Sequence, residues 1–291
     1  MRMVIPDTPA SCSRPLRLTT TDGITLALEQ FGGMEGPAVV FAHGFGQTRD
    51  AWSSCAAATA QHGWVGITYD ARGHGQSSWL NTHDYAVDQL VADLGHVAAQ
   101  APSLPVVVGA SMGGLVGIAM AGGDATSCRA LVLVDVTPRW EPAGVERILD
   151  FMRANPDGFA NYAEAADSIA AYLPHRKSRK SPESLRRLLI EKESGRLHWH
   201  WDPNMLAPIA NDGARHQRDL LEAATRIRVP TLLISGAASD VVSESTINEF
   251  LELVPHARHV MVPHATHMVA GDENSQFTRH VLEFLDSLPT F

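Results

Sequence analysis

Short apolar runs alternate with helical stretches along most of the chain, and this alternation limits the fold more than any other feature. The runs are continuous, rich in β-branched residues and bounded by turn residues, which is typical of strands buried on both faces of a parallel sheet. They span residues 38–43, 65–70, 106–111, 130–136, 231–237 and 259–265. Amphipathic helical patterns lie between them. The sequence therefore predicts an α/β fold with a doubly wound, mostly parallel sheet.

One segment interrupts the alternation. Between residues 138 and 225 we find several amphipathic helical stretches separated by Pro, Gly and Ser, but no clear buried strand. Because the strand pattern resumes afterwards, we expect a helical cap (138–225) inserted into one sheet domain made of residues 1–137 and 226–291. An Asp22-Gly23 turn between two alternating runs predicts a β-hairpin near the start of the chain.

Composition narrows the class of protein. The chain has 291 residues, 45% of them hydrophobic, and a formal net charge of −9. An acidic surface repels phosphate backbones, so nucleic acid is not an expected partner. The one basic cluster, residues 175–180, is interpreted as a solvated helix end or loop.

The cysteines and the N-terminus indicate a compartment. Cys12, Cys55 and Cys128 are odd in number and far apart, which favours free thiols in a reducing environment over a disulfide framework. The first residues contain no apolar signal-peptide core, and no run reaches the roughly 18 apolar residues that a membrane span needs. We therefore expect a cytoplasmic protein without a membrane partner.

A serine stands between glycines at the end of the third apolar run. Three valines lead into Gly109-Ala110-Ser111-Met112-Gly113, and a helical stretch of small residues follows. In a Gly-x-Ser-x-Gly turn between strand and helix, the hydroxyl projects from the carboxyl edge of the sheet, and bulkier neighbours would clash. The first amides of the next helix stabilise negative charge at that point. This context predicts that Ser111 is a nucleophile.

A second motif, His-Gly-Phe-Gly (residues 43–46), directly follows the first apolar run. A tetrahedral oxyanion needs two converging amide donors. The expected pair is the N–H of Phe45 in this loop and the N–H of Met112, the residue after the nucleophile. His43 is interpreted as a support for the loop rather than as a base.

The order of these motifs resembles the α/β-hydrolase family over nearly the whole chain. A His-Gly loop (43–46), an Asp-x-Arg-Gly-x-Gly loop (70–75), the Gly-x-Ser-x-Gly turn and a helical insertion come in that sequence. A late acid and histidine complete the order. The similarity is greatest to capped serine esterases, lactonases and cofactor-free haloperoxidase-like members. Asp70 and Arg72 of the second loop are interpreted as structural.

In that family the acid and then the histidine follow the nucleophile. The resemblance implies Asp240, just after the fifth apolar run, as the acid and His267, after the last run, as the base. Two alternatives remain open. Asp135, which ends the fourth run, could supply the carboxylate, and His264 could supply the imidazole. Thr266 stands where the family often has glycine.

The resemblance implies a serine hydrolase that cleaves a carboxylic ester or lactone through an acyl-enzyme, with a Ser-His-Asp triad and no cofactor. A carbon–carbon bond hydrolase or a perhydrolase would use the same triad, and a non-catalytic ligand receptor is a third alternative. Epoxide hydrolases and haloalkane dehalogenases of this fold carry aspartate in place of Ser111, which disfavours their chemistry here.

The expected substrate is a small, largely apolar ester or lactone, and a homodimer is left open. Side chains at the start of the cap and in its Trp-x-Trp stretch are candidates to line the pocket or, alternatively, to form the core of the cap. They are His43 from the first loop and Trp140, Phe151, Met152, Trp199 and Trp201. His198 and His200 have the spacing of metal ligands, but no third ligand is evident, so no metal is predicted.

Overall fold

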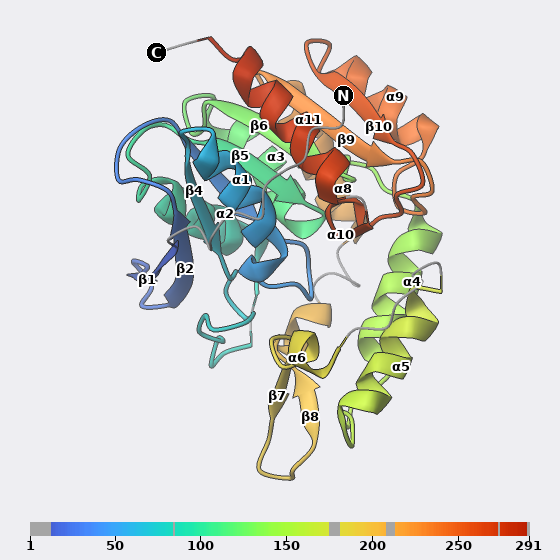
Figure 1. The fold of residues 1–291 in the computed structure, drawn as a ribbon. Helices are drawn as coiled ribbons and strands as arrows, with labels where there is room; N and C mark the ends of the chain where they lie inside the picture. The colour runs from blue at the N-terminus through green and yellow to red at the C-terminus, as the bar shows by residue number, and fades with distance from the viewer. Residues whose placement is uncertain (1–12, 84, 175–180, 208–212, 273, 290–291) are drawn as a thin grey trace, which may run out of the picture.

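Within the described residues (13–83, 85–174, 181–207, 213–272 and 274–289), eight strands form one sheet in this computed structural model (Figure 1). Their order is β1-β2-β4-β3-β5-β6-β9-β10. The strands are β1 (Ser13–Thr19), β2 (Thr25–Phe31), β3 (Ala38–Ala42), β4 (Val65–Tyr69), β5 (Val106–Ala110), β6 (Ala130–Val134), β9 (Thr231–Gly236) and β10 (Arg258–Val262).

All neighbouring strands from β4 to β10 run parallel, whereas β1, β2 and β4 pair antiparallel. The predicted mostly parallel sheet is therefore confirmed. The predicted hairpin is also confirmed, since β1 and β2 join through a turn in which Gly23 has a φ of 85°. A positive φ of this size favours glycine, which explains the Asp22-Gly23 signal.

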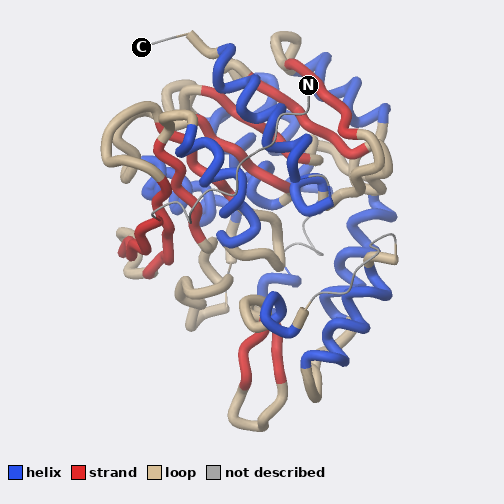
Figure 2. The backbone as a smooth tube through the Cα atoms, in the orientation of Figure 1, coloured by secondary structure: helices blue, strands red, loops and turns tan. Residues whose placement is uncertain are grey.

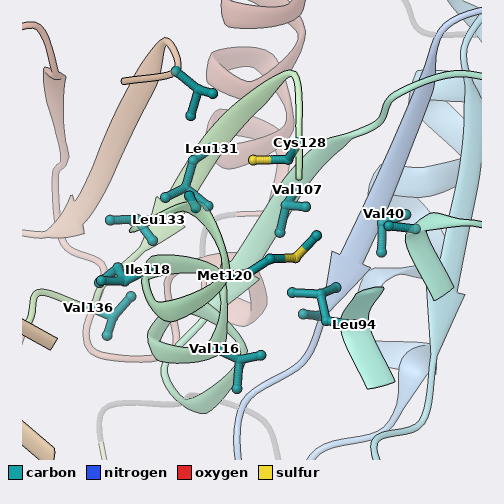
Figure 3. Close-up of a cluster of buried hydrophobic side chains, with 14 of the residues drawn as sticks. Val40, Leu94, Val107, Val116, Ile118, Met120, Cys128, Leu131, Leu133 and Val136 are labelled. Atoms are coloured by element: carbon teal, nitrogen blue, oxygen red, sulfur yellow. The ribbon is translucent and has the colours of Figure 1, made fainter. Parts of the chain in front are cut away.

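Successive strand residues alternate between two buried layers. Val39 and Phe41 face the layer of α1 (Ser53–Gln61) and α11 (Asn274–Ser287), whereas Val40 faces the opposite layer. That opposite layer contains α2 (Val87–Ala98), α3 (Met112–Gly123), α8 (Gly213–Thr225) and α9 (Glu244–Leu253). Figure 3 shows its centre, where Ile118 and Met120 of α3 pack towards the sheet. Burial on both faces accounts for the unbroken apolar runs.

Most of the chain between β6 and β9 forms a separate group of elements that projects to one side of the sheet, at the lower right of Figure 1. It contains α4 (Pro142–Arg153), α5 (Tyr162–Tyr172), α6 (Pro182–Leu185), β7 (Leu189–Glu191), β8 (Leu197–Trp199) and the short helix η2 (Pro203–Met205). We refer to residues 138–212 as the insertion. The structure adds a hairpin that the sequence did not predict, since β7 and β8 pair antiparallel apart from the main sheet (Figure 2). Strands of three residues are too short for a periodic signal.

The last helix of the predicted cap packs elsewhere. α8 lies against α3, and its Leu220 and Ala223 belong to the apolar layer beneath the sheet. The approach is so close that a Cβ on Gly122 of α3 would lie 2.2 Å from the carbonyl oxygen of Ala223. α8 therefore packs with the sheet rather than with the insertion, although the sequence prediction placed it in the cap. Its amphipathic pattern fits either surface equally well.

Some sequence expectations fall outside the described residues, namely those on the first residues of the chain, Cys12 and the basic cluster 175–180. Cys55 and Cys128 are buried free thiols. Across the described part of the chain, the helices are too short or too polar to cross a bilayer.

Candidate active site

Ser111 lies at the turn between β5 and α3 in a backbone conformation that few non-glycine residues adopt. Its φ is 48° and its ψ is −120°, a strained combination that is typical of functional sites. The flanking glycines provide the necessary space. A Cβ on Gly109 would lie 2.5 Å from the carbonyl oxygen of Gly113, and a Cβ on Gly113 would lie 2.3 Å from that of Ala42. The turn therefore presents Ser111 at the carboxyl end of β5.

His267 pairs with Asp135. The Nδ1 atom of His267 lies 2.8 Å from Oδ2 of Asp135, a carboxylate that is fully buried just beyond the end of β6. The same carboxylate accepts hydrogen bonds from the backbone N–H of Gly236 at 2.8 Å and from the hydroxyl of Ser239 at 2.5 Å. These two donors fix the carboxylate, so the imidazole that it holds is also fixed in orientation.

The expectation that Asp240 holds this histidine is wrong. Its carboxylate is 37% exposed and pairs with Arg147 of α4, with Nε 2.6 Å from Oδ2. The loop after β9 instead contributes the neighbouring Ser239, which bonds to Asp135. β6 lies between β5 and β9 in the sheet, so a carboxylate at the end of β6 stands closer to the serine turn. Asp135, the alternative left open by the sequence, occupies that position.

The two candidate histidines lie differently. His264 is exposed and has a φ of 64°, and it is absent from the walls of the large cavity beside the serine turn. His267, by contrast, lines this cavity together with Ser111. No hydrogen bond joins Ser111 to His267 among the described residues. In serine hydrolases the contact between nucleophile and base is commonly long without substrate and tightens when substrate binds.

The loop after β3 lies directly against the serine. A Cβ on Gly44 would stand 3.3 Å from Cβ of Ser111, and the loop closes on itself through the N–H of Gln47, which donates to Gly44 O at 3.1 Å. Phe45 lines the cavity. Within the described chain, neither the N–H of Phe45 nor that of Met112 has a hydrogen-bond partner, so both remain available to a bound group.

The cavity has a volume of about 660 Å³ and lies between the serine turn and the insertion. Its insertion side is mainly apolar. The apolar and aromatic side chains there are Ile148, Phe151, Met152, Ile169, Tyr172, Leu173, Leu188 and Trp199, and the polar ones are Ser181, Ser184 and Arg187. A volume of this size falls within the range of small-molecule sites, which are usually apolar with a few polar groups that fix orientation.

Three of the side chains expected to line the cavity do so: Phe151, Met152 and Trp199. The other three are absent from its walls. Trp201 is 3% exposed and packs on the ring of Phe45, with 5.1 Å between ring centroids. Trp140 packs against the helical layer under the sheet. His43 is buried, with Nδ1 2.8 Å from the carbonyl oxygen of Gly44 and Nε2 accepting the N–H of Ala71 at 3.0 Å, in keeping with its interpretation as a support.

The loop after β4 is also absent from the cavity walls. Asp70 accepts hydrogen bonds from the backbone N–H of Arg49 at 2.7 Å and of Gln76 at 2.9 Å. Arg72 forms a bidentate pair with Asp93, in which both nitrogen–oxygen distances are 2.7 Å. Both residues bind protein groups, which agrees with the structural roles expected of them.

The comparisons with known proteins identify the family. The model of the family described as alpha/beta hydrolase fold matches residues 37–273. The chain belongs to the alpha/beta-hydrolase family. A 3-hydroxybutyrate-oligomer hydrolase of Cupriavidus necator is 30% identical over 259 residues, which cover 83% of this chain and 86% of that relative. The resemblance stated from the motifs is thereby confirmed.

Solved structures share the fold of this hydrolase. An esterase of Mycobacterium tuberculosis is similar, with a TM-score of 0.74 and 25% identity over 97% of this chain and 94% of that one. An E-2-(acetamidomethylene)succinate hydrolase has a TM-score of 0.81 and covers 95% of this chain and 100% of that chain, and at 22% identity it shows the fold alone.

Three buried histidines of the hydrolase lie together behind the serine loop, a cluster that the sequence did not predict. The ring centroids of His43 and His74 are 5.1 Å apart, and those of His74 and His200 are 6.0 Å apart. Each ring accepts one backbone N–H, from Ala71, Gly46 and Gly75 respectively. Each opposite ring nitrogen lies at a backbone carbonyl oxygen. The rings are therefore held neutral, each in one tautomer. We call them the histidine cluster.

We expect the histidine cluster to make the hydrolase less stable in acid. Burial lowers the pKa of His43 and His74, and it lowers that of His200 to about 4. The charged groups nearest the cluster are Asp70 and Arg49. The unfolded chain takes up these protons near the ordinary histidine pKa of about 6.5, so the contribution of the cluster to the free energy of unfolding is fully present above that pH. As the pH drops further, the free energy of unfolding decreases by about 1.4 kcal/mol per pH unit for each histidine, until the pKa of the folded state is reached.

Urea unfolding between about pH 7 and about pH 5 measures this loss. His200→Gln removes one of the three titrating rings. The slope of the free energy of unfolding against pH should therefore become shallower by the equivalent of about one proton in that variant. Equal slopes for the wild-type and variant proteins would show that the cluster does not titrate on unfolding.

Proposed function

We propose that this hydrolase cleaves carboxylic esters through an acyl-enzyme formed on Ser111. The observation that carries the proposal is the pairing of His267 with the buried carboxylate of Asp135, beside a cavity that Ser111 also lines. An imidazole whose Nδ1–H is held by a carboxylate presents Nε2 as a base. The esterase of Mycobacterium tuberculosis, similar in fold and sequence, supports the same class of reaction.

In the proposed reaction, Nε2 of His267 removes the hydroxyl proton of Ser111 while the serine oxygen attacks the ester carbonyl. The N–H groups of Phe45 and Met112 stabilise the resulting oxyanion. When the tetrahedral adduct collapses, the alkoxide leaves with the proton from the imidazolium. Water, deprotonated by the same histidine, then releases the carboxylic acid and regenerates Ser111. Asp135 stays ionised and stabilises the imidazolium.

The cavity lining supports an ester with a sizeable apolar part. Apolar side chains of α4 and α5 face the space above Ser111, among them Ile148, Phe151 and Ile169. Burial of each methylene group against such a surface contributes about 0.8 kcal/mol. Medium-length acyl or alcohol groups, and lactones as cyclic esters, are therefore the proposed substrates.

The test combines turnover with labelling of the nucleophile. Wild-type protein is assayed on p-nitrophenyl esters of increasing acyl length and treated with a fluorophosphonate, and the labelled peptide is mapped by mass spectrometry. We expect ester turnover, a label on Ser111 and loss of activity in proportion to labelling. Ser111→Ala should lack both label and turnover. Turnover retained in that variant would overturn the proposed function.

A further inference from the structure

His200 connects the insertion to the loop against which Ser111 lies. It directly follows β8 and its side chain is 2% exposed. Nδ1 accepts the backbone N–H of Gly75 at 2.9 Å, and Nε2 lies 3.2 Å from the carbonyl oxygen of Gly46. Because an N–H group can only donate, Nδ1 must be unprotonated, so Nε2 carries the hydrogen and donates to Gly46. One ring thus bridges two loops that follow different strands of the sheet.

The peptide groups of Gly46 are held on both sides by the histidine cluster. Its N–H donates to Nε2 of His74 at 3.2 Å, while its carbonyl accepts from His200. The residue has a φ of 74°, and a Cβ at this position would lie 2.4 Å from Cε of Met152. Gly46 therefore has a backbone conformation that glycine alone adopts readily, in a space that excludes a side chain.

The position of Phe45 depends on this arrangement. Phe45 precedes Gly46, and its ring is held between His74 and Trp201, with centroid distances of 5.2 Å and 5.1 Å. The N–H of Phe45 is the oxyanion donor in the proposed reaction. A donor of this kind acts through its preset direction, and a displacement of about 1 Å costs about 10²-fold in rate.

We propose that His200 is a positioning residue for the oxyanion loop, through which the insertion sets the direction of the Phe45 N–H. This role rests on the proposed function. His200 itself lies outside the cavity walls and touches no substrate. The bond from Nε2 to Gly46 is the essential one, because together with the bond from the Gly46 N–H to His74 it fixes both peptide groups of the residue that follows the donor. The bond from Nδ1 to Gly75 anchors the ring to the second loop.

Two amide substitutions separate these bonds. In His200→Gln, the side-chain nitrogen reaches the place of Nε2 and can still donate to Gly46. In His200→Asn, the shorter amide matches Nδ1 and can accept from Gly75, but it does not reach Gly46. His198→Gln is the matched control, since this histidine lies two residues earlier in β8 and packs beside Gly158, away from the cavity.

The readouts are kcat and KM on a p-nitrophenyl ester, the rate of fluorophosphonate labelling of Ser111, and the thermal unfolding temperature. For His200→Asn we expect kcat and the labelling rate to fall about 10- to 100-fold while KM changes less than about threefold. For His200→Gln we expect kcat within about fivefold of wild type, and for His198→Gln no change.

Equal losses in the glutamine and asparagine variants, or an asparagine variant within about threefold of wild type, would overturn the role of His200. So would a loss confined to KM, which would indicate substrate binding, or losses that merely follow the unfolding temperature. Failure of the proposed function is recognised separately. In that case wild-type protein itself shows neither turnover nor labelling at Ser111, and the positioning role falls with it.

Discussion

Asp135→Asn should lower kcat for an ester substrate by about 10⁴-fold, whereas Asp240→Asn should leave it within a few-fold of wild type. Asparagine keeps the oxygen that accepts the N–H of Gly236 but presents an NH₂ group where the carboxylate meets Nδ1 of His267. An NH₂ group must face an unprotonated nitrogen, so the ring adopts the other tautomer and Nε2 can no longer act as a base.

Steady-state kinetics with a p-nitrophenyl ester measures both variants, and thermal unfolding checks that each remains folded. Asp240 is the appropriate control because its exposed ion pair with Arg147 of α4 involves neither Ser111 nor His267. Large losses for Asp240→Asn together with small ones for Asp135→Asn would reverse the assignment of the acid.

Arg72→Leu should lower the free energy of unfolding by about 3–5 kcal/mol. The guanidinium is 1% exposed and its partner Asp93 is fully buried, so the substitution leaves an uncompensated charge in the interior. Replacing both partners with Leu should recover most of the loss, because the double variant leaves no buried charge behind. Urea unfolding at about pH 7 measures all of these proteins.

Arg139 provides the matched surface control. It forms a bidentate pair with Glu249 of similar geometry, at 2.7 and 2.9 Å, but the two side chains are 48% and 33% exposed. Pairs in water contribute about 0–1 kcal/mol, so Arg139→Leu should cost little. A cost for Arg72→Leu no larger than that for Arg139→Leu would show that burial of the pair does not matter.

The sheet and the serine turn were predictable because their signals are local. Runs such as Val106-Val107-Val108 are apolar without interruption only when both faces of a strand are covered. The glycine before Ser111 is also a local requirement, since the clash at Gly109 arises between β5 and the helix that follows it, whereas the clash at Gly113 arises with Ala42 of β3.

The acid was not predictable from order along the chain alone. Asp135 and Asp240 each follow a buried strand near its carboxyl end, and the residues around each are compatible with a loop. What distinguishes them is the direction of each side chain after the strand ends. Asp135 has a φ of 48° and turns inward to His267, whereas Asp240 turns outward to Arg147.

The histidine cluster was missed for a related reason. His43, His74 and His200 come from three loops that are distant in sequence, and only the assembled fold brings their rings together. The spacing of His198 and His200 suggested metal ligation, a hypothesis that the sequence itself disfavoured. The more informative signal was the position of His200 between Trp199 and Trp201, because a polar residue among large apolar ones is typical of a buried group with all its hydrogen bonds made.

Ser111, Asp135 and His267 follow β5, β6 and the last strand β10, so the sheet carries all three side chains of the proposed triad, while the insertion supplies most of the apolar wall. Substitutions in the insertion can therefore change which substrates fit the cavity without changing the proposed triad, provided that the imidazole of His200 is kept. A chimaera that receives the insertion of a distant homologue should acquire that homologue's substrate selectivity only when the new insertion also carries a donor for the carbonyl oxygen of Gly46.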